Sequence, residues 1–223
     1  MKYFSLILIP LLLLAFNVYG QIKPTKKMQN NIEKLPENEL VVPEGLNAIV
    51  LAGGCFWCTE AMYLQLKGVK SVESGYAGGH TINPTYEQIC DHSINTGHAE
   101  GVKITYDSKE ISLEDILDAF WQLHDPTTLN RQGNDVGSQY RSEIFYRTTL
   151  EKETTMASLQ KANEELWNGK IVTAITAYSN FYKAEDYHQN FYKRNPNQSY
   201  CAYVITPKVK KFQKIFKDKL KAE

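Results

Sequence analysis

Residues 47–68, NAIVLAGGCFWCTEAMYLQLKG, contain the signals that decide the fold. NAIVLA (47–52) is a short apolar run of the kind found in buried strands, and the two glycines that follow it mark a tight turn. CFWCTEAMYLQLKG (55–68) has helical character, and Gly68 is placed to end that helix as a C-cap. The stretch therefore predicts strand, turn and helix in direct succession, with Cys55 in the first turn of the helix.

Strands and helices continue to alternate downstream, without the regular period of a doubly wound sheet. Ser112, followed three residues later by Asp115, resembles a capping box that opens a helix over 112–125. Further strands are predicted at 69–79, 101–107, 142–147 and 171–178, and further helices at 150–167, 184–195 and from Thr206 to the end. We predict an α+β fold, a two-layer α/β roll with a ferredoxin-like mixed sheet, flanking helices, an extended N-terminal lead-in and a C-terminal helix.

In the C-terminal helix, Val209, Phe212, Ile215, Phe216 and Leu220 have core-facing spacing. The seven lysines between Lys208 and Lys221 are interpreted as its solvated face. The polar stretch 125–142 is long for a loop in a compact domain, and such loops tend to be functional.

The composition and the N-terminal segment limit the classes of function that the protein can have. The 25 Lys and Arg residues balance 25 Asp and Glu residues in a chain of 223, so no basic excess suggests a nucleic-acid partner. Residues 1–20 have a positive start, an apolar run and a small residue before Gln21, as a secretory signal peptide does. We expect residues 21–46 to be an irregular lead-in and 47–223 a single catalytic domain, exported to a periplasmic or other extracytoplasmic compartment, without stable membrane insertion after cleavage.

Four cysteines, at positions 55, 58, 90 and 201, carry the chemical signal. An exported protein can form structural disulfides, but Cys55 and Cys58 are too close to staple a useful loop. A zinc site lacks a second closely spaced ligand pair, so we expect no metal and no other cofactor. Cys55 is predicted at a helix N-terminus after a strand, where the helix dipole lowers a thiol pKa, and it is the best candidate nucleophile.

Two hypotheses compete for this nucleophile. A thioredoxin-like dithiol oxidoreductase would use Cys55 and Cys58 together, although the bulky Phe56 and Trp57 between them are unusual for that motif. Alternatively, one thiolate reduces an oxidised substrate and a separate cysteine resolves the product.

Six sequence blocks resemble the A-type peptide methionine sulfoxide reductases and occur in the order of that family. The blocks are GGCFWCTE (53–60), GYAGG (75–79), PTYEQIC (84–90), TGHAE (96–100), QGNDVGSQYRS (132–142) and NPNQSYCAYVITPKVKKF (195–212). The resemblance implies reduction of the S epimer of methionine sulfoxide, free or in proteins, and hence repair of oxidised proteins.

The resemblance also implies roles for individual residues. Cys55 matches the nucleophile, and Glu100 matches the acid that protonates the sulfoxide oxygen, for which burial should raise its pKa. The substrate-binding residues implied are Phe56 and Trp57 around the methyl group, Tyr86 and Tyr140 on the oxygen, and Asp135 in shaping the site. His98 is expected to give structural support, His188 to lie near the site, and Cys90 to be a buried small hydrophobe.

The implied cycle ends with a disulfide. After methionine leaves, Cys55 is a sulfenic acid, and a second thiol condenses with it. Cys201 matches the usual resolving position, with Cys58 as the alternative. We expect an external thioredoxin-like dithiol to reduce the disulfide, and the protein to act as a monomer.

The export prediction is tested by producing the full chain in a bacterium with an intact secretory pathway. N-terminal sequencing of the mature protein should begin at Gln21, because cleavage follows Gly20. Leu12→Lys, which interrupts the apolar run, should leave the precursor uncleaved. Recovery of the wild-type chain with Met1 intact in the membrane fraction would contradict the prediction.

Overall fold

The structure is a computed structural model that describes residues 40–222. The strands are β1 (Asn47–Gly53), β2 (Val69–Ala77), β3 (Ala99–Tyr106), β4 (Arg131–Gln132), β5 (Asp135–Val136), β6 (Ser142–Tyr146), β7 (Ala174–Ala177) and β8 (Phe181–Lys183). The helices are α1 (Phe56–Tyr63), α2 (Tyr86–Cys90), α3 (Leu113–Leu123), α4 (Thr149–Glu165), α5 (Phe191–Arg194) and α6 (Thr206–Ile215). The predicted signal peptide and most of the lead-in lie outside the described residues.

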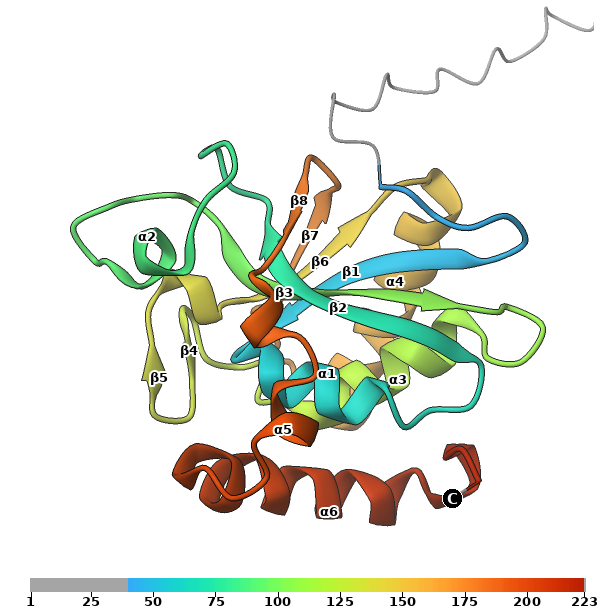
Figure 1. Cartoon of the computed structure of the whole chain (residues 1–223). Helices are drawn as coiled ribbons and strands as arrows, with labels where there is room; N and C mark the ends of the chain where they lie inside the picture. The colour runs from blue at the N-terminus through green and yellow to red at the C-terminus, as the bar shows by residue number, and fades with distance from the viewer. Residues whose placement is uncertain (1–39, 223) are drawn as a thin grey trace, which may run out of the picture. The chain divides into compact units, whose positions relative to one another are not determined.

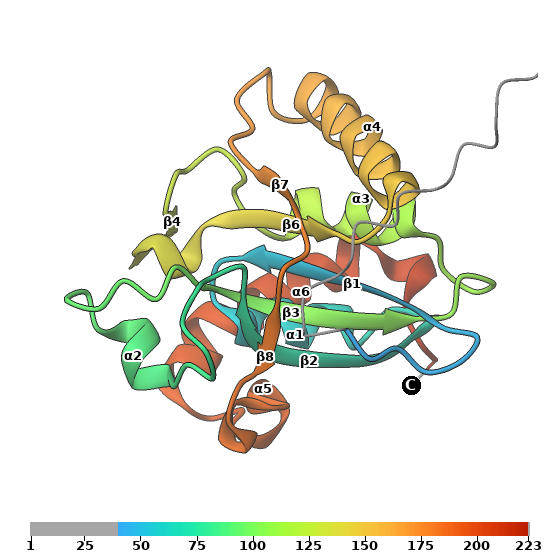
Figure 2. The ribbon, with the colours of Figure 1, turned by 90° about the horizontal axis from the view of Figure 1, so that it is seen from above.

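One mixed sheet organises these elements, in the order β7-β6-β1-β3-β2-β8. Its neighbouring strands are antiparallel except for the parallel pair β6–β7. In Figure 1, α1 and α3 lie beneath the sheet, and α6 lies beyond α1 on the side away from the strands. Figure 2 shows α4 outside the sheet near α3, which it contacts. The predicted α+β class with a mixed sheet and flanking helices is confirmed.

Strand β1 is apolar from Ala48 to Ala52 because both of its faces are covered. Ile49 and Leu51 face the larger core, which includes α1, α3 and α6. Ala48, Val50 and Ala52 face a smaller core on the other side of the sheet, with Phe145 and Tyr178. A strand buried on both faces loses the alternating pattern of a half-exposed strand, which explains the continuous run in NAIVLA.

The turn after β1 requires glycine at position 54. Gly54 has φ +89°, and a Cβ there would lie 2.5 Å from Cγ of Gln132. The Gln132 side chain in turn bonds both backbone groups of Asp125, each at 3.1 Å. The long 125–142 segment is therefore fixed against the turn that precedes Cys55, and it contains the β4–β5 hairpin rather than loop alone.

Helix α1 ends at Tyr63, before the predicted cap at Gly68. The chain beyond it bonds the C-terminal segment instead of continuing the helix: Lys67 N donates to the Lys219 carbonyl at 2.8 Å, and Leu66 forms a bridge with Leu220. These partners are distant in sequence, so the local signal at Gly68 could not show them.

The capping box predicted for α3 is present, with Asp115 N bonding Ser112 Oγ at 3.1 Å and Ser112 N bonding Asp115 Oδ2 at 3.4 Å. Helix α6 begins at Thr206, after a π-helical turn at Cys201–Ile205. Val209, Phe212 and Phe216 are buried as predicted, but Ile215 is 43% exposed.

A continuous helix over 184–195 was predicted, and this prediction is wrong. A short 3-10 turn, Asp186–His188, is separated from α5 by Gln189 and Asn190. The Gln189 amide bonds the backbone N and O of Ser74 on β2, and Asn190 takes a left-handed φ of +53°. These tertiary contacts outweigh the local preference for helix. Between residues 40 and 222, no helix is both long enough and apolar enough to cross a membrane.

Candidate active site

The Glu100 carboxylate lies against the N-terminus of α1. Glu100 is near the start of β3, paired with Tyr76 of β2, and it is only 2% exposed. Its Oε2 accepts a hydrogen bond of 3.2 Å from the backbone N of Phe56, the first residue of α1. Burial raises the pKa of Glu100 to about 8, and the Phe56 hydrogen bond opposes part of that shift. The carboxyl group is therefore mostly protonated at neutral pH.

Cys55 occupies the N-cap position of α1, as expected, but its thiol is not acidified there. The residue is 7% exposed, and burial raises its pKa well above the ordinary value. The hydrogen bond with the Cys58 thiol and the charges of Cys58 and Glu100 add to the rise. The expectation of a lowered pKa is corrected: desolvation in this enclosed position outweighs the helix dipole, and the N–H of Phe56 is already used by Glu100.

Cys58, one turn into α1, has the opposite electrostatic character. Its thiol shares a hydrogen bond with Cys55, which lowers the Cys58 pKa, and burial opposes the change. The ammonium of Lys208 also lowers it, with Nζ 3.8 Å from the Cys58 sulfur. Of two thiols on one helical turn, Cys58 therefore ionises more readily.

Tyr200 joins Asp135 to the thiol pair, and sequence reasoning missed it. Its hydroxyl donates a hydrogen bond of 2.8 Å to Asp135 Oδ2, and it also lies in hydrogen-bond contact with Cys55 and Cys58. Asp135 belongs to β5 of the 125–142 segment, so this contact connects the hairpin to the segment before Cys201. The available sequence signal was the position of Tyr200 directly before Cys201 in the SYC block.

Aromatic rings from α1 and α5 form one wall beside these groups. Trp57 stacks on Phe191 with 3.7 Å between ring centroids, and its Nε1 donates to His188 Nδ1 at 3.1 Å. Phe56 packs against His188 and Tyr76 at centroid distances of 5.0 and 6.0 Å. His188 is thus near the site, as expected, and burial lowers its pKa, so it is a neutral acceptor for the indole.

Tyr86 and Tyr140 are close enough to Glu100 for its charge to influence the pKa of each phenol. Burial raises the pKa of both phenols first, and the charge of Glu100 raises both further. Tyr86 opens α2, where its backbone N bonds Glu185 Oε1 at 2.9 Å, while Glu185 Oε2 accepts from Tyr76. Both phenols therefore keep their protons at neutral pH and can donate hydrogen bonds.

The remaining predicted residues are Cys201, Cys90 and His98. Cys201 is fully buried in the π-helical turn, and its pKa is raised by burial and then by the charge of Cys58. All four cysteines are free. Cys90 is half-buried and bonds Tyr86, which corrects the expectation of a buried hydrophobe. His98 supports the structure as expected: Nδ1 accepts from Gly79 N at 3.1 Å, and Nε2 lies 2.8 Å from the Thr81 carbonyl.

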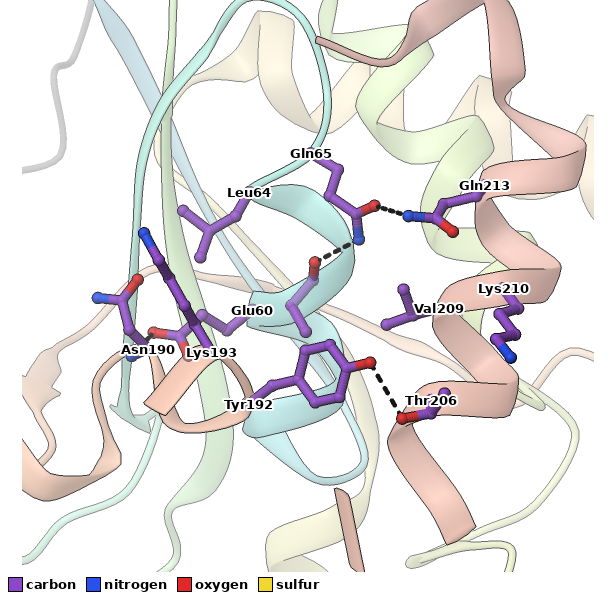
Figure 3. Close-up of a pocket in the computed structure, with 11 residues that line it drawn as sticks. Glu60, Leu64, Gln65, Asn190, Tyr192, Lys193, Thr206, Val209, Lys210 and Gln213 are labelled. Atoms are coloured by element: carbon purple, nitrogen blue, oxygen red, sulfur yellow. Dashed lines mark hydrogen bonds between the residues drawn. The ribbon is translucent and has the colours of Figure 1, made fainter. Parts of the chain in front are cut away.

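A separate pocket of about 370 Å³ lies between α1, α5 and α6, and the four cysteines do not line it (Figure 3). Glu60 of α1 faces Asn190, whose N donates to Glu60 Oε1 at 2.9 Å, and Tyr192 bonds Thr206 at 3.0 Å across the pocket. Glu60 is 1% exposed, and burial raises its pKa to about 7.

Free thiols beside a protonated acid and two protonated phenols define the class of thiol-dependent oxidoreductases. In the part of the chain that the structure describes, no cluster of three or more His, Cys, Asp or Glu side chains is arranged to hold a metal ion. The model of the peptide methionine sulfoxide reductase family matches residues 47–220. The chain belongs to this family of oxidoreductases.

Individual relatives agree with the family match. The peptide methionine sulfoxide reductase MsrA of Saccharolobus solfataricus is 51% identical over 176 residues, which cover 79% of this chain and 98% of the relative. That of Leptospira borgpetersenii is 56% identical over 164 residues, covering 74% and 92%. Among solved structures, reduced Mxr1 from Saccharomyces cerevisiae has a TM-score of 0.66 at 32% identity, covering 75% of this chain and 95% of that one. Methionine sulfoxide reductase A of Corynebacterium diphtheriae has a TM-score of 0.65 at 31% identity, covering 69% and 77%.

The raised pKa of Glu60 makes stability depend on pH. Because the folded state binds the Glu60 proton more tightly than the unfolded state, the free energy of unfolding should fall as pH rises from about 4.5 to about 7. Glu60→Gln should remove about 2 kcal/mol of the decline between pH 5 and pH 8, measured by urea unfolding. Exposed Glu153→Gln is the matched control, and an equal decline in wild type and Glu60→Gln would contradict the prediction.

Proposed function

We propose that this protein reduces the S epimer of methionine sulfoxide, free or in oxidised proteins, and so repairs oxidised proteins. The observation that carries the proposal is the buried Glu100, hydrogen-bonded at 3.2 Å to the residue after Cys55 and protonated near neutral pH. The alternative, a dithiol oxidoreductase using Cys55 and Cys58, releases no oxygen that must be protonated and so gives Glu100 no such role. Family membership also favours the reductase over that alternative.

The first step transfers the sulfoxide oxygen to the Cys55 sulfur. Cys55 attacks the electrophilic sulfur of the substrate while Glu100 delivers its proton to the oxygen, which is otherwise a poor leaving group. The proton given up by the Cys55 thiol restores the acid. The adduct formed by the attack then collapses: its new S–S bond and the S–O bond of the substrate both break, methionine leaves, and the oxygen remains on Cys55 as a sulfenic acid. The substrate sulfur is reduced by two electrons and the cysteine sulfur is oxidised by two.

The protonated phenols and the aromatic wall serve this step in different ways. Tyr86 and Tyr140 donate hydrogen bonds to the sulfoxide oxygen as negative charge builds on it. Phe56 and Trp57 enclose the methyl group on the substrate sulfur, and the stacking of Trp57 on Phe191 holds the indole in place. Asp135 fixes Tyr200 beside the thiols.

The sulfenic acid is then resolved by a second thiol of the chain. Resemblance favours Cys201, whereas the contacts favour Cys58, which already shares a hydrogen bond with Cys55. An external thioredoxin-like dithiol regenerates the free thiols by exchange, becoming a disulfide itself. In an exported protein this dithiol must be supplied in the extracytoplasmic compartment.

The function is tested with the S and R epimers of methionine sulfoxide and excess dithiothreitol, with methionine quantified by chromatography. The wild-type protein should release methionine from the S epimer only, because one face of the sulfur is offered to Cys55. Cys55→Ser should release none, while Cys90→Ser should match wild type. Release from neither epimer would refute the reductase assignment, and release by Cys55→Ser would refute the nucleophile.

The role of Glu100 is tested by the pH dependence of a single turnover. Because the acid form is required and the Glu100 pKa is about 8, methionine release should decline as pH rises through about 8. Glu100→Gln should slow release by roughly 10²- to 10⁴-fold and abolish that decline. Glu87→Gln, on exposed α2 surface, should behave as wild type. A Glu100→Gln variant that keeps the wild-type rate would overturn the assignment.

A further inference from the structure

Lys208 departs from the other lysines of the C-terminal segment. It stands in the first turn of α6, directly after Pro207, and is partly buried. Its Nζ lies 3.8 Å from the Cys58 sulfur, and none of the ion pairs among the described residues includes it. Lys210, two residues on, is exposed and belongs to the separate pocket of Figure 3. The solvated-face interpretation is therefore incomplete, because one lysine is directed at a thiol.

Charged and titratable groups reach Cys58 from every element packed around it. On α1 the Cys55 thiol bonds it, and from the π-helical segment come the Tyr200 hydroxyl and the nearby Cys201. Asp135 of β5 disfavours an anion at Cys58, and the effect of Glu100 is small while its carboxyl is protonated. The Lys208 ammonium is the cation that offsets Asp135. An amine 3.8 Å from sulfur in a 3% exposed site is screened little by water.

We propose that Lys208 holds Cys58 as the thiolate that resolves the Cys55 sulfenic acid. This inference rests on the proposed function, since the sulfenic acid must form first. Lys208 is a positioning residue, because its ammonium contacts the Cys58 sulfur and acts on the reaction through that sulfur.

The resolving step is balanced by one thiolate and one proton. The Cys58 sulfur attacks the Cys55 sulfur, a disulfide bond forms, and the S–O bond of the sulfenic acid breaks. The hydroxide that leaves takes up a proton and departs as water. The Cys58 sulfur supplies the electron pair of the new S–S bond; formally it is oxidised by one electron and the sulfenic sulfur is reduced by one, so that both reach the disulfide level. The thioredoxin-like dithiol later returns two electrons to the disulfide. Only the thiolate of Cys58 reacts, so its population sets the rate.

The experiment follows a single turnover without reductant. The reduced protein is mixed with S-methionine sulfoxide; methionine release reports the first step, and alkylation with mass-spectrometric peptide mapping reports closure of the Cys55–Cys58 disulfide. Lys208→Gln should release methionine at the wild-type rate but close the disulfide about tenfold more slowly, because the loss of a nearby cation raises the Cys58 pKa and leaves less thiolate. The pH profile of closure should move upward accordingly, and Lys208→Arg should restore both. Lys210→Gln is the matched control for loss of one positive charge from α6.

Each result has a defined meaning. Absence of methionine release by wild type would refute the proposed function before Lys208 is tested. Normal release followed by closure at the wild-type rate in Lys208→Gln would overturn the role of Lys208. Wild-type closure in Cys58→Ser through a Cys55–Cys201 disulfide would overturn it as well. Two further results would show a structural effect only and would also overturn the role of Lys208. One is that Lys210→Gln slows disulfide closure as much as Lys208→Gln does; the other is that Lys208→Gln slows closure without shifting its pH profile.

Discussion

The burial of one carboxyl group against the first N–H of a helix determines the rest of the site. Glu100 comes from a strand that pairs with β1 and β2 along most of its length, and the helix it contacts follows β1 after a two-residue turn. Gly101 permits this close approach, because a Cβ there would lie 3.1 Å from the Leu51 carbonyl. The sheet thus fixes acid and nucleophile relative to each other without a flexible connection, and the phenols and aromatic rings are arranged around that pair.

Exclusion of water has opposite effects on the groups it encloses. It keeps Glu100 and the phenols protonated, which makes them donors, and it also disfavours ionisation of Cys55. Cys58 is equally buried, yet its pKa is lowered, because hydrogen bonds and a cation act on it directly. The two cysteines of one helical turn therefore differ in pKa: that of Cys55 is raised and that of Cys58 is lowered. The difference arises from their specific neighbours and not from their solvent exposure.

Features set by neighbouring residues could be read from the sequence, and features set by distant contacts could not. The β1 strand and the Ser112 capping box depend on short local patterns, and both are present. The break before α5 depends on Gln189 bonding Ser74, 115 residues away, which no local propensity encodes. For the same reason the contact of Lys208 with Cys58 could not be predicted, because the two residues are 150 positions apart in the sequence. The site residues Cys55 and Glu100 were instead predicted from ordered blocks of family resemblance, whereas the role of Tyr200 depends on its contact with Asp135, 65 residues away.

Tyr200 and Lys208 lie far downstream of Cys55 and Cys58 in the sequence, so they are synthesised later. Domains fold as units while synthesis proceeds from the N-terminus, so the two cysteines of α1 emerge long before the groups that make one of them acidic. A polypeptide that ends before Tyr200 lacks both of these groups, and of the influences that lower the Cys58 pKa only the hydrogen bond with Cys55 is then available. The full lowering of the Cys58 pKa thus requires the C-terminal segment.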